Sequence, residues 1–436
     1  MRRRLILILI TTTLSARAAH GERLLTLAEA LQTAREHQPQ LLQARANTSA
    51  AFAQALQARS GLLPQLGFTG SYQRTTANFV PRPGISVKAA QGTTPPNNFD
   101  TFDFYNFGLT ANQLVYDFGQ TTGKWRAAQA AAGGTADTEQ ATLISILQGV
   151  RVTYFAACAT KALVEVAAQT LDNQDKHLRQ IEGFVDVGTR PEIDLAQGKT
   201  DVANAKVSLI NSQNQYAIAK AQLNQAIGIE GKVDYEVQTE SLPPVPGEDT
   251  GSQILFEEAA GARPDLAALV EQRRSQQLTL DSIRGAYAPS IGVATGMTDA
   301  GGQVGNLGWN WNAGVTVTWP LYQGGLTDAQ VSQAKANLVA VDAQISALRQ
   351  SILVQVQQAR LTVVANRESL KAAEEALVNA KERLRLAEGR YETGVGSVIE
   401  LGDAQVALTN AAAQRVDAEF NLASARAALL QALGRT

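Results

Sequence analysis

The stretch Leu114-Val-Tyr-Asp-Phe-Gly119 returns later in the chain as Pro320-Leu-Tyr-Gln-Gly-Gly325. The two copies start 206 residues apart (320 − 114), and Gly188 and Gly394 keep the same offset (394 − 188). More than a hundred residues of each half therefore align without a net insertion. Two long copies of one unit predict a pseudo-symmetric tube or array rather than a catalytic pocket.

The offset between the copies is larger near the start of each copy. Pro39 and Pro264 are 225 residues apart (264 − 39), and so are Gly67 and Gly292 (292 − 67), so a difference of 19 residues (225 − 206) falls between Gly67 and Leu114. We predict a single elongated chain at 19–436, with repeat one at about 24–229, a linker at about 230–253 and repeat two at about 254–434.

The N-terminus has the pattern of a secretory signal peptide. Met1-Arg-Arg-Arg4 supplies a positive start, a short apolar run follows, and Ala16-Arg-Ala18 provides small residues for cleavage. We predict that 1–18 is removed by cleavage after Ala18, or one residue later, and that the chain is exported from the cytoplasm. A retained N-terminal anchor is the alternative.

Composition excludes several classes of function. The 38 basic and 40 acidic side chains nearly balance, which gives no general attraction to nucleic acid. Cys158 is the only cysteine, and His20, His37 and His177 lie far apart in sequence. We therefore predict no disulfide, metal site or cofactor. No combination of nucleophile, base and metal ligands indicates an enzyme.

Four short segments, two in each repeat, show strand periodicity. The clearest is Trp309-Asn-Trp-Asn-Ala-Gly-Val-Thr-Val-Thr-Trp319, whose odd-numbered positions are all apolar and whose ends are tryptophans. Alternation over about 10 residues with aromatic ends is typical of a lipid-facing barrel strand. A half-buried sheet of a soluble protein is the alternative. The apolar faces of the other three segments contain Tyr105, Phe107, Leu109 and Ala111; Leu66, Phe68 and Tyr72; and Ile291, Val293 and Met297.

A membrane location would have to depend on these strands. After the signal segment, the sequence contains no apolar run near the roughly 20 residues of a membrane helix. Four strands cannot close a barrel, since about eight is the practical minimum. A barrel would therefore require several copies of the chain.

Long helices fill most of the remaining sequence. Proline is absent from 118–187 and from 323–393, so each copy can form a helix of roughly 70 residues, about 105 Å long. The end of the second helix has a heptad pattern, which predicts close packing against a neighbouring helix. Its positions are Leu370, Ala373, Leu377, Ala380, Leu384, Ala387 and Tyr391.

Each long helix is predicted to turn back at a glycine, Gly188 or Gly394. The segments Thr189-Arg-Pro-Glu192 and Ser397-Val-Ile-Glu400 follow, and both have the S/T-x-x-E form of a capping box. We predict that these boxes begin the two returning helices.

The two turns carry a family resemblance. Val187-Gly-Thr-Arg-Pro-Glu-Ile-Asp194 and the segment from Tyr391 to Gln405, together with the strand pairs and long helices, resemble the TolC-type outer-membrane efflux proteins. The resemblance implies a mixed α and β fold with an internal two-fold repeat. It implies a trimeric 12-stranded outer-membrane β-barrel, with four strands from each chain, continued by a long periplasmic α-helical barrel.

The resemblance also implies a function and partners. The chain would be the outer-membrane channel of a tripartite efflux or type I secretion system, a passive exit duct across the periplasm and the outer membrane. Its partners would be two further copies, a periplasmic adaptor protein, an inner-membrane transporter and outer-membrane lipid. A periplasmic coiled-coil adaptor or structural protein is the alternative, although it would not explain the tryptophan-bounded strand.

Members of this family close the tunnel at its periplasmic tip through tyrosine, arginine and aspartate contacts. The resemblance assigns the tyrosine to Tyr391 and acidic positions to Asp194, Glu400 and Asp403. Glu400 also has the capping-box interpretation. Gly396 stands where the best-known pattern has an arginine, which predicts that one contact between helices is missing. The adaptor-docking candidates at the turns are Gly188, Thr189, Gly394, Gly396 and Ser397.

Overall fold

The structure is a computed structural model that describes residues 23–76, 99, 101–231 and 233–436. The predicted signal segment at 1–18 lies outside the described residues, as does 77–98, which falls within the part of the chain that carries the 19-residue difference (225 − 206). The cleavage prediction therefore stays a prediction.

The two halves of the chain contain the same series of elements. The first half has α1 (Leu27–His37), α2 (Pro39–Ser60), β2 (Gln65–Thr76), β3 (Thr101–Tyr116), α4 (Gln120–Asp186) and α5 (Glu192–Ile227). The second half has α6 (Ser252–Ala262), α7 (Pro264–Gly285), β5 (Ser290–Gly301), β6 (Gly308–Thr318), α8 (Leu326–Glu392) and α9 (Val398–Ala432).

The element boundaries confirm the internal repeat. Each of α6, α7 and β5 begins and ends 225 residues after its counterpart, as in 252 − 27 for α6 and α1. The helices α4 and α8 both have 67 residues and are 206 apart (326 − 120). The exact bounds proposed for the repeats and the linker remain a prediction.

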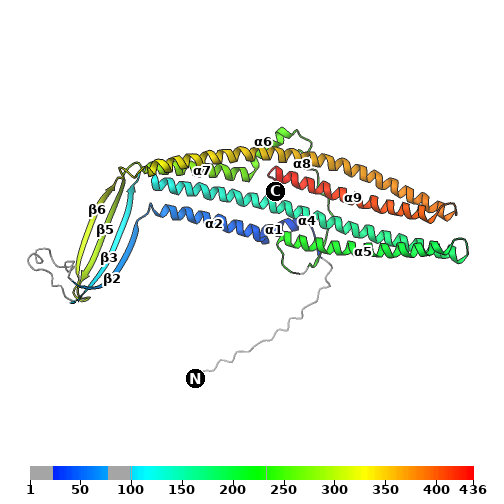
Figure 1. The fold of residues 1–436 in the computed structure, drawn as a ribbon, viewed down its shortest axis with the longest axis horizontal. Coiled ribbons are helices and arrows are strands. Elements are labelled where there is room, and N and C mark those ends of the chain that lie inside the picture. The colour runs from blue at the N-terminus through cyan, green and yellow to red at the C-terminus, as the bar shows by residue number, and fades with distance from the viewer. Residues whose placement is uncertain (1–22, 77–98, 100, 232) are drawn as a thin grey trace, which may run out of the picture. The chain divides into compact units, whose positions relative to one another are not determined.

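The four predicted strands form one antiparallel sheet in the order β2-β3-β5-β6 (Figure 1). The first strands of the two copies, β2 and β5, have 12 residues each, and β6 has 11. The register places apolar side chains in one row across all four strands: Phe68, Leu109, Met297 and Trp311. The adjacent row, which points to the other face, consists of Thr69, Gly108, Thr298 and Asn310.

Both faces of this sheet are largely uncovered by the chain itself. Every residue of β6 is exposed, and Phe68 and Trp311 are 72% and 63% exposed. A soluble sheet normally buries one face against its own core. The apolar face of this sheet is therefore available to lipid or to another chain.

One long helix passes a length and composition test for a membrane span, which the sequence analysis did not anticipate. α4 contains an 18-residue window of mean hydropathy 1.3, and half of that window is buried inside the protein. A core helix of a soluble region gives the same result, so the observation does not identify a membrane helix.

The described chain divides into two compact units that cut across the repeats. The first contains the described residues up to Gln38 together with Ile146–Pro246 and Leu361–Ala428. The second contains Pro39–Ser145, Gly247–Arg360 and Leu429–Thr436. The sheet belongs to the second unit, and the turns at the ends of the long helices belong to the first.

The first unit contains two short strands that sequence analysis missed. β1 (Arg23–Leu25) pairs in parallel with β4 (Tyr235–Val237), which lies in the predicted linker. The hydroxyl of Tyr154 on α4 donates to the carbonyl oxygens of Leu25 at 3.2 Å and Gln238 at 2.7 Å. These bonds attach the small sheet to the long helix, and burial raises the pKa of Tyr154.

In the second unit, α7 packs closely on the start of α4. A Cβ atom added at Gly123 would lie 2.7 Å from the Cβ of Ser282, so a larger residue would force the helices apart. The Ser282 hydroxyl donates to the carbonyl of Gln120 at 2.6 Å. The contact therefore depends on a residue without a side chain.

The heptad pattern of α8 is confirmed. All seven of its positions are buried or half-buried, whereas most residues between them are exposed. Ala380, Leu384, Ala387 and Tyr391 are buried, so the pattern is most deeply covered in the last turns of the helix. These turns form the candidate functional site.

Candidate functional site

Two tight turns end the helical hairpins α4–α5 and α8–α9 (Figure 1). Gly188 and Gly394 have φ angles of +76° and +79°, the left-handed conformation that glycine adopts without steric cost. Each following residue returns a hydrogen bond to the helix end: the Thr189 amide donates to Phe184 at 2.9 Å, and the Val395 amide donates to Arg390 at 3.0 Å. Both turns therefore use the same glycine-based helix ending.

The capping-box prediction is wrong for the first turn. The Thr189 hydroxyl donates to the carbonyl of Phe184 at 2.8 Å, so it completes the end of α4 instead of capping α5. The residue before α5 is Pro191, which makes no side-chain cap. In the second turn, the hydroxyl half of the box is present, because the Glu400 amide donates to the Ser397 Oγ at 3.1 Å.

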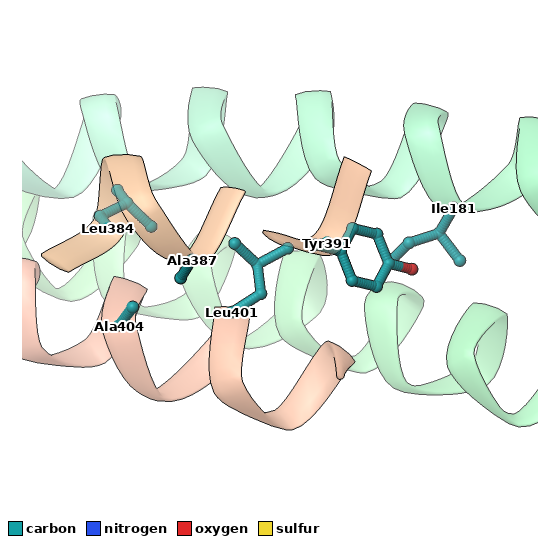
Figure 2. Close-up of a cluster of buried hydrophobic side chains, with 6 residues drawn as sticks. All are labelled: Ile181, Leu384, Ala387, Tyr391, Leu401 and Ala404. Carbon is teal, nitrogen blue, oxygen red and sulfur yellow. The ribbon is translucent and has the colours of Figure 1, made fainter. Parts of the chain in front are cut away.

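Buried side chains from both hairpins meet next to these turns. Figure 2 shows the cluster, in which Ile181 of α4 lies beside Tyr391 at the end of α8. Partly buried residues from α4, α5 and α9 complete the packing. The buried members are Ile181, Leu384, Ala387, Tyr391, Leu401 and Ala404, and their neighbours are Phe184, Val185, Leu195, Val398 and Leu408.

Tyr391 is the centre of this cluster and is 1% exposed. Its ring meets Phe184 edge-on with centroids 6.0 Å apart, and the guanidinium carbon of Arg190 lies 4.6 Å from its ring centroid. Its hydroxyl has no hydrogen-bond partner in the described chain. Burial raises the pKa of Tyr391. The positive charge of Arg190 lowers this pKa, and the negative charge of Asp194 raises it.

The three predicted acidic gate residues have different surroundings. Asp194 is buried at 8% exposure close to Tyr391, so it does not face open solvent in the single chain. Asp403 is exposed on α9. The carboxylate of Glu400 lies 3.4 Å from Arg390, which links the start of α9 to the end of α8. Glu400 thus takes part in both the turn and an ion pair.

Four of the docking candidates are exposed, namely Gly188, Thr189, Gly394 and Ser397. Gly396 is buried. A Cβ atom at Gly396 would lie 2.9 Å from the backbone nitrogen of Tyr391 and 3.0 Å from the carbonyl carbon of Arg390. Gly396 is therefore a packing residue of the turn.

Sequence analysis missed Arg190 as a site residue. Its Nη2 atom donates to the carbonyl oxygen of Gly396 at 3.0 Å, and this carbonyl belongs to the other hairpin. A signal was present in the sequence, because Arg190 and Gly396 are 206 residues apart (396 − 190) and occupy equivalent places in the two repeats.

Two further polar groups near the cluster were also missed. His177 of α4 is 12% exposed, and its Nε2 lies 3.6 Å from a carboxylate oxygen of Glu388 on α8, which is too far for a hydrogen bond. Burial lowers the pKa of His177. The buried Oε1 of Gln405 likewise has no partner in the described chain. Unpaired buried groups make the packing of this region less stable than that of an apolar core.

The geometry supports a structural or gating role for this region. Among the described residues, no group of three or more His, Cys, Asp or Glu side chains is placed to hold a metal ion. The site consists of two hairpin ends joined by aromatic, ionic and backbone contacts.

Known proteins resemble this chain over most of its length. "Outer membrane protein TolC" of Escherichia coli (strain K12) is 26% identical over 435 residues, covering 94% of this chain and 82% of that protein. "Outer membrane efflux protein BepC" of Brucella suis biovar 1 (strain 1330) is 26% identical over 440 residues, covering 97% and 88%.

Solved structures share the fold. A crystal structure of CusC, in a study of transmembrane channel formation, matches with a TM-score of 0.80 at 20% identity, covering 94% of this chain and 92% of that chain. The outer membrane protein VceC from Vibrio cholerae matches with a TM-score of 0.79 at 19% identity, covering 94% and 96%.

A family model described as "Outer membrane efflux protein" matches residues 30–229 and 255–435. These two segments contain both helical hairpins, all four strands of the large sheet and both glycine turns. The chain belongs to the outer membrane efflux protein family.

Proposed function

We propose that three copies of the chain form an outer-membrane channel, a passive exit duct for efflux or type I secretion. The observation that carries this proposal is the row Phe68, Leu109, Met297 and Trp311, which extends one exposed apolar face across all four strands. A continuous apolar band of this kind is what a lipid-facing barrel wall requires. A periplasmic adaptor would have no use for it.

The sheet topology supports closure by identical copies. The edge strands are β2 and β6, and because each neighbouring pair is antiparallel, β2 runs antiparallel to β6. The β6 edge of one copy can therefore pair with the β2 edge of the next without breaking the antiparallel pattern. Three copies would give 12 strands, above the minimum of about eight, and a closed ring would leave no free edge.

The tip of the helical hairpins is the proposed gate. Asp403 is exposed on α9, and threefold symmetry would place three copies of it around one axis. Asp194 is buried and its charge acts on Tyr391, and Glu400 links the second turn to Arg390. The exposed turn residues Gly188, Thr189, Gly394 and Ser397, with Gly396 supporting the second turn, would meet the adaptor.

The proposed partners are inferred from the names of relatives and from the passive nature of the duct. Two relatives are named as outer membrane proteins of efflux pumps, one of them a toluene efflux pump. A passive duct needs an energised pump, so this chain would work with a periplasmic adaptor protein and an inner-membrane transporter. The exported compound would be selected largely by that transporter.

Fractionation and electrophoresis test the proposal. The protein should be found in the outer membrane, migrate as a trimer on an unheated gel and collapse to a monomer after heating. The purified trimer should conduct ions in planar bilayers. Recovery as a soluble monomer with no conductance would reject both the channel and the trimer.

A further inference from the structure

The side chain of Arg190 joins the two hairpins of a single chain. Arg190 lies on the α4–α5 turn, and its Nη2 atom reaches the α8–α9 turn, where it donates to the carbonyl of Gly396 at 3.0 Å and lies 3.5 Å from that of Tyr391. Its guanidinium carbon is also 4.6 Å from the Tyr391 ring centroid. One side chain therefore makes both a charge-assisted hydrogen bond and a cation–π contact.

The internal repeat explains why this arginine lies on the first turn. Arg190 and Gly396 are equivalent positions (396 − 190 = 206). A side chain at 396 would begin 2.9 Å from the Tyr391 nitrogen, so the second turn cannot accommodate an arginine without moving its backbone. The first turn supplies the guanidinium, and the second supplies the carbonyl that accepts from it.

We propose that Arg190 holds the two tip hairpins of one subunit together and so controls how readily the tip opens. We call this set of contacts, from Arg190 to Gly396 and to the Tyr391 ring, the Arg190 bridge. The proposal rests on the channel function proposed above, because only a channel has a tip that opens. It assigns to the first hairpin a contact that the family pattern places in the second.

The contacts of the Arg190 bridge are of a kind that can break and re-form. Within the described ranges of the chain, the Tyr391 hydroxyl has no hydrogen-bond partner, so the ring is held by its contacts with Arg190, Phe184 and the apolar cluster. Arg190 itself is only half-buried, so water can replace its hydrogen bond when the hairpins separate. A planar guanidinium can stack on the Tyr391 ring and donate a hydrogen bond to the Gly396 carbonyl at the same time. A lysine ammonium is a compact charge and could make only one of these two contacts well.

The test compares variants of the intact protein in planar bilayers. Arg190→Ala should raise the fraction of time that the channel is open by about tenfold, the order expected when a stacked cation and a charge-assisted hydrogen bond are lost. Arg190→Lys should give a smaller increase. Arg179→Ala is the matched control, because Arg179 is an exposed arginine of α4 in the same hairpin, and it should behave like the parent.

A double variant tests whether the two contacts act as one. Tyr391→Leu should also open the tip, and Arg190→Ala with Tyr391→Leu should open it by less than the product of the two single effects, because the contact between the guanidinium and the ring is lost only once. Additive effects would show that Arg190 does not act through the Tyr391 ring and would overturn the proposed bridge. So would an Arg190→Ala channel that is open for the same fraction of time as the parent and keeps an intact trimer.

Hydrogen exchange separates failure of the bridge from failure of the channel function. Amides of the turns at 187–191 and 393–397 should exchange faster in Arg190→Ala than in the parent, whether or not the protein conducts. If the parent forms no channel, the proposed function fails, and parental exchange rates in the variant would overturn the bridge independently.

Discussion

At two glycines of the tip, Gly394 and Gly402, backbone conformation and not crowding decides whether another residue is tolerated. Gly394 has a φ angle of +79°, and a Cβ atom there would meet no atom within 4 Å. Gly402 lies inside α9, and its Cβ would also meet no atom within 4 Å. The two positions therefore differ in backbone angle and not in available space.

Alanine substitution should have opposite effects at these two glycines. Gly394→Ala should destabilise the chain by about 1 kcal/mol, because a side chain disfavours the left-handed conformation. Gly402→Ala should stabilise α9 by about 0.5–1 kcal/mol, because alanine is the better helix former. Thermal unfolding of the purified variants measures both, and a shift of the same sign in each would contradict this explanation.

Asp403 gives a second prediction at the scale of single residues. Asp403→Asn should lower the cation preference of the channel by about fourfold or more, since one charge about 5 Å from a cation attracts it by about 0.8 kcal/mol in water. Reversal potentials in planar bilayers under a salt gradient measure this preference.

Asp417 provides the control for that measurement. It is exposed on the same face of α9, 14 residues later (417 − 403), and about 21 Å away along the helix. If the tip is the narrow part, Asp417→Asn should change selectivity much less. Equal effects at both positions would place the constriction elsewhere.

At the scale of elements, the two faces of β6 should tolerate charge differently. Val315 pairs with Val293 on the apolar face, and Thr316 pairs with Gly292 on the polar face. Val315→Asp should cost roughly 1–3 kcal/mol of assembly free energy, because a carboxylate facing lipid is desolvated without a partner. Thr316→Asp should be tolerated. Trimer yields on unheated gels measure the difference, and equal yields would reject the assigned faces.

The contact between α4 and α8 should weaken on mild acidification. Burial lowers the pKa of His177, while Glu388 and Glu392 on α8 and Gln180 on α4 act in the opposite direction. In the unfolded state the imidazole of His177 binds a proton below about pH 6.5. In the folded state it binds the proton only at a lower pH, because its pKa is lowered. The unfolded state therefore holds more protons in this window, and stability falls as pH falls.

Hydrogen exchange at pH 7.5 and pH 5.5 can measure this effect. Amides of the adjacent turns of α4 and α8 should lose protection at the lower pH in the parent, and His177→Gln should remove most of that pH dependence. An unchanged pH dependence in the variant would show that another group titrates.

Sequence predicted the elements well because their signals are local. The two-residue period of β6 and the heptads of α8 each depend on neighbours a few residues away. Because the sequence repeats, elements recognised in one half predicted the equivalent elements in the other half. The strands β1 and β4 have only three residues each, which is too short for a periodic signal. Thr189 matched the capping pattern, but its hydroxyl donates to a carbonyl at the end of α4 instead of accepting from an amide of α5.

The site was predicted less completely because its contacts are distant in sequence. Tyr391 was identified from its turn sequence, but Arg190 lies 201 residues before it (391 − 190). The burial of Asp194 and the exposure of Asp403 depend on how the hairpins pack, which no local pattern specifies.

At the scale of the whole molecule, cross-linking tests the proposed closure. Cysteine at Thr69 on β2, combined with cysteine at one of several β6 positions, should yield covalent species up to the trimer. The β6 positions to test are Asn310, Asn312 and Gly314.

The native cysteine should not interfere with this experiment. Cys158 is buried, and burial raises the pKa of its thiol to about 11, which keeps it protonated and unreactive. The Thr69→Cys single variant is the control and should form no ladder. Absence of cross-linked species for every β6 position would reject direct pairing of β6 with β2 of the next copy.

The Arg190 bridge also has a consequence for the symmetry of the assembly. The two hairpins end in turns of the same backbone conformation. The first turn supplies the guanidinium that donates a hydrogen bond, and the second supplies the carbonyl that accepts it. In a trimer, the six hairpins would form two alternating chemical types, so the end of the tunnel would have threefold and not sixfold symmetry. An adaptor that formed a ring of six identical subunits would then meet two different environments in turn, so the ring would bind as three equivalent pairs, each made of two non-equivalent subunits.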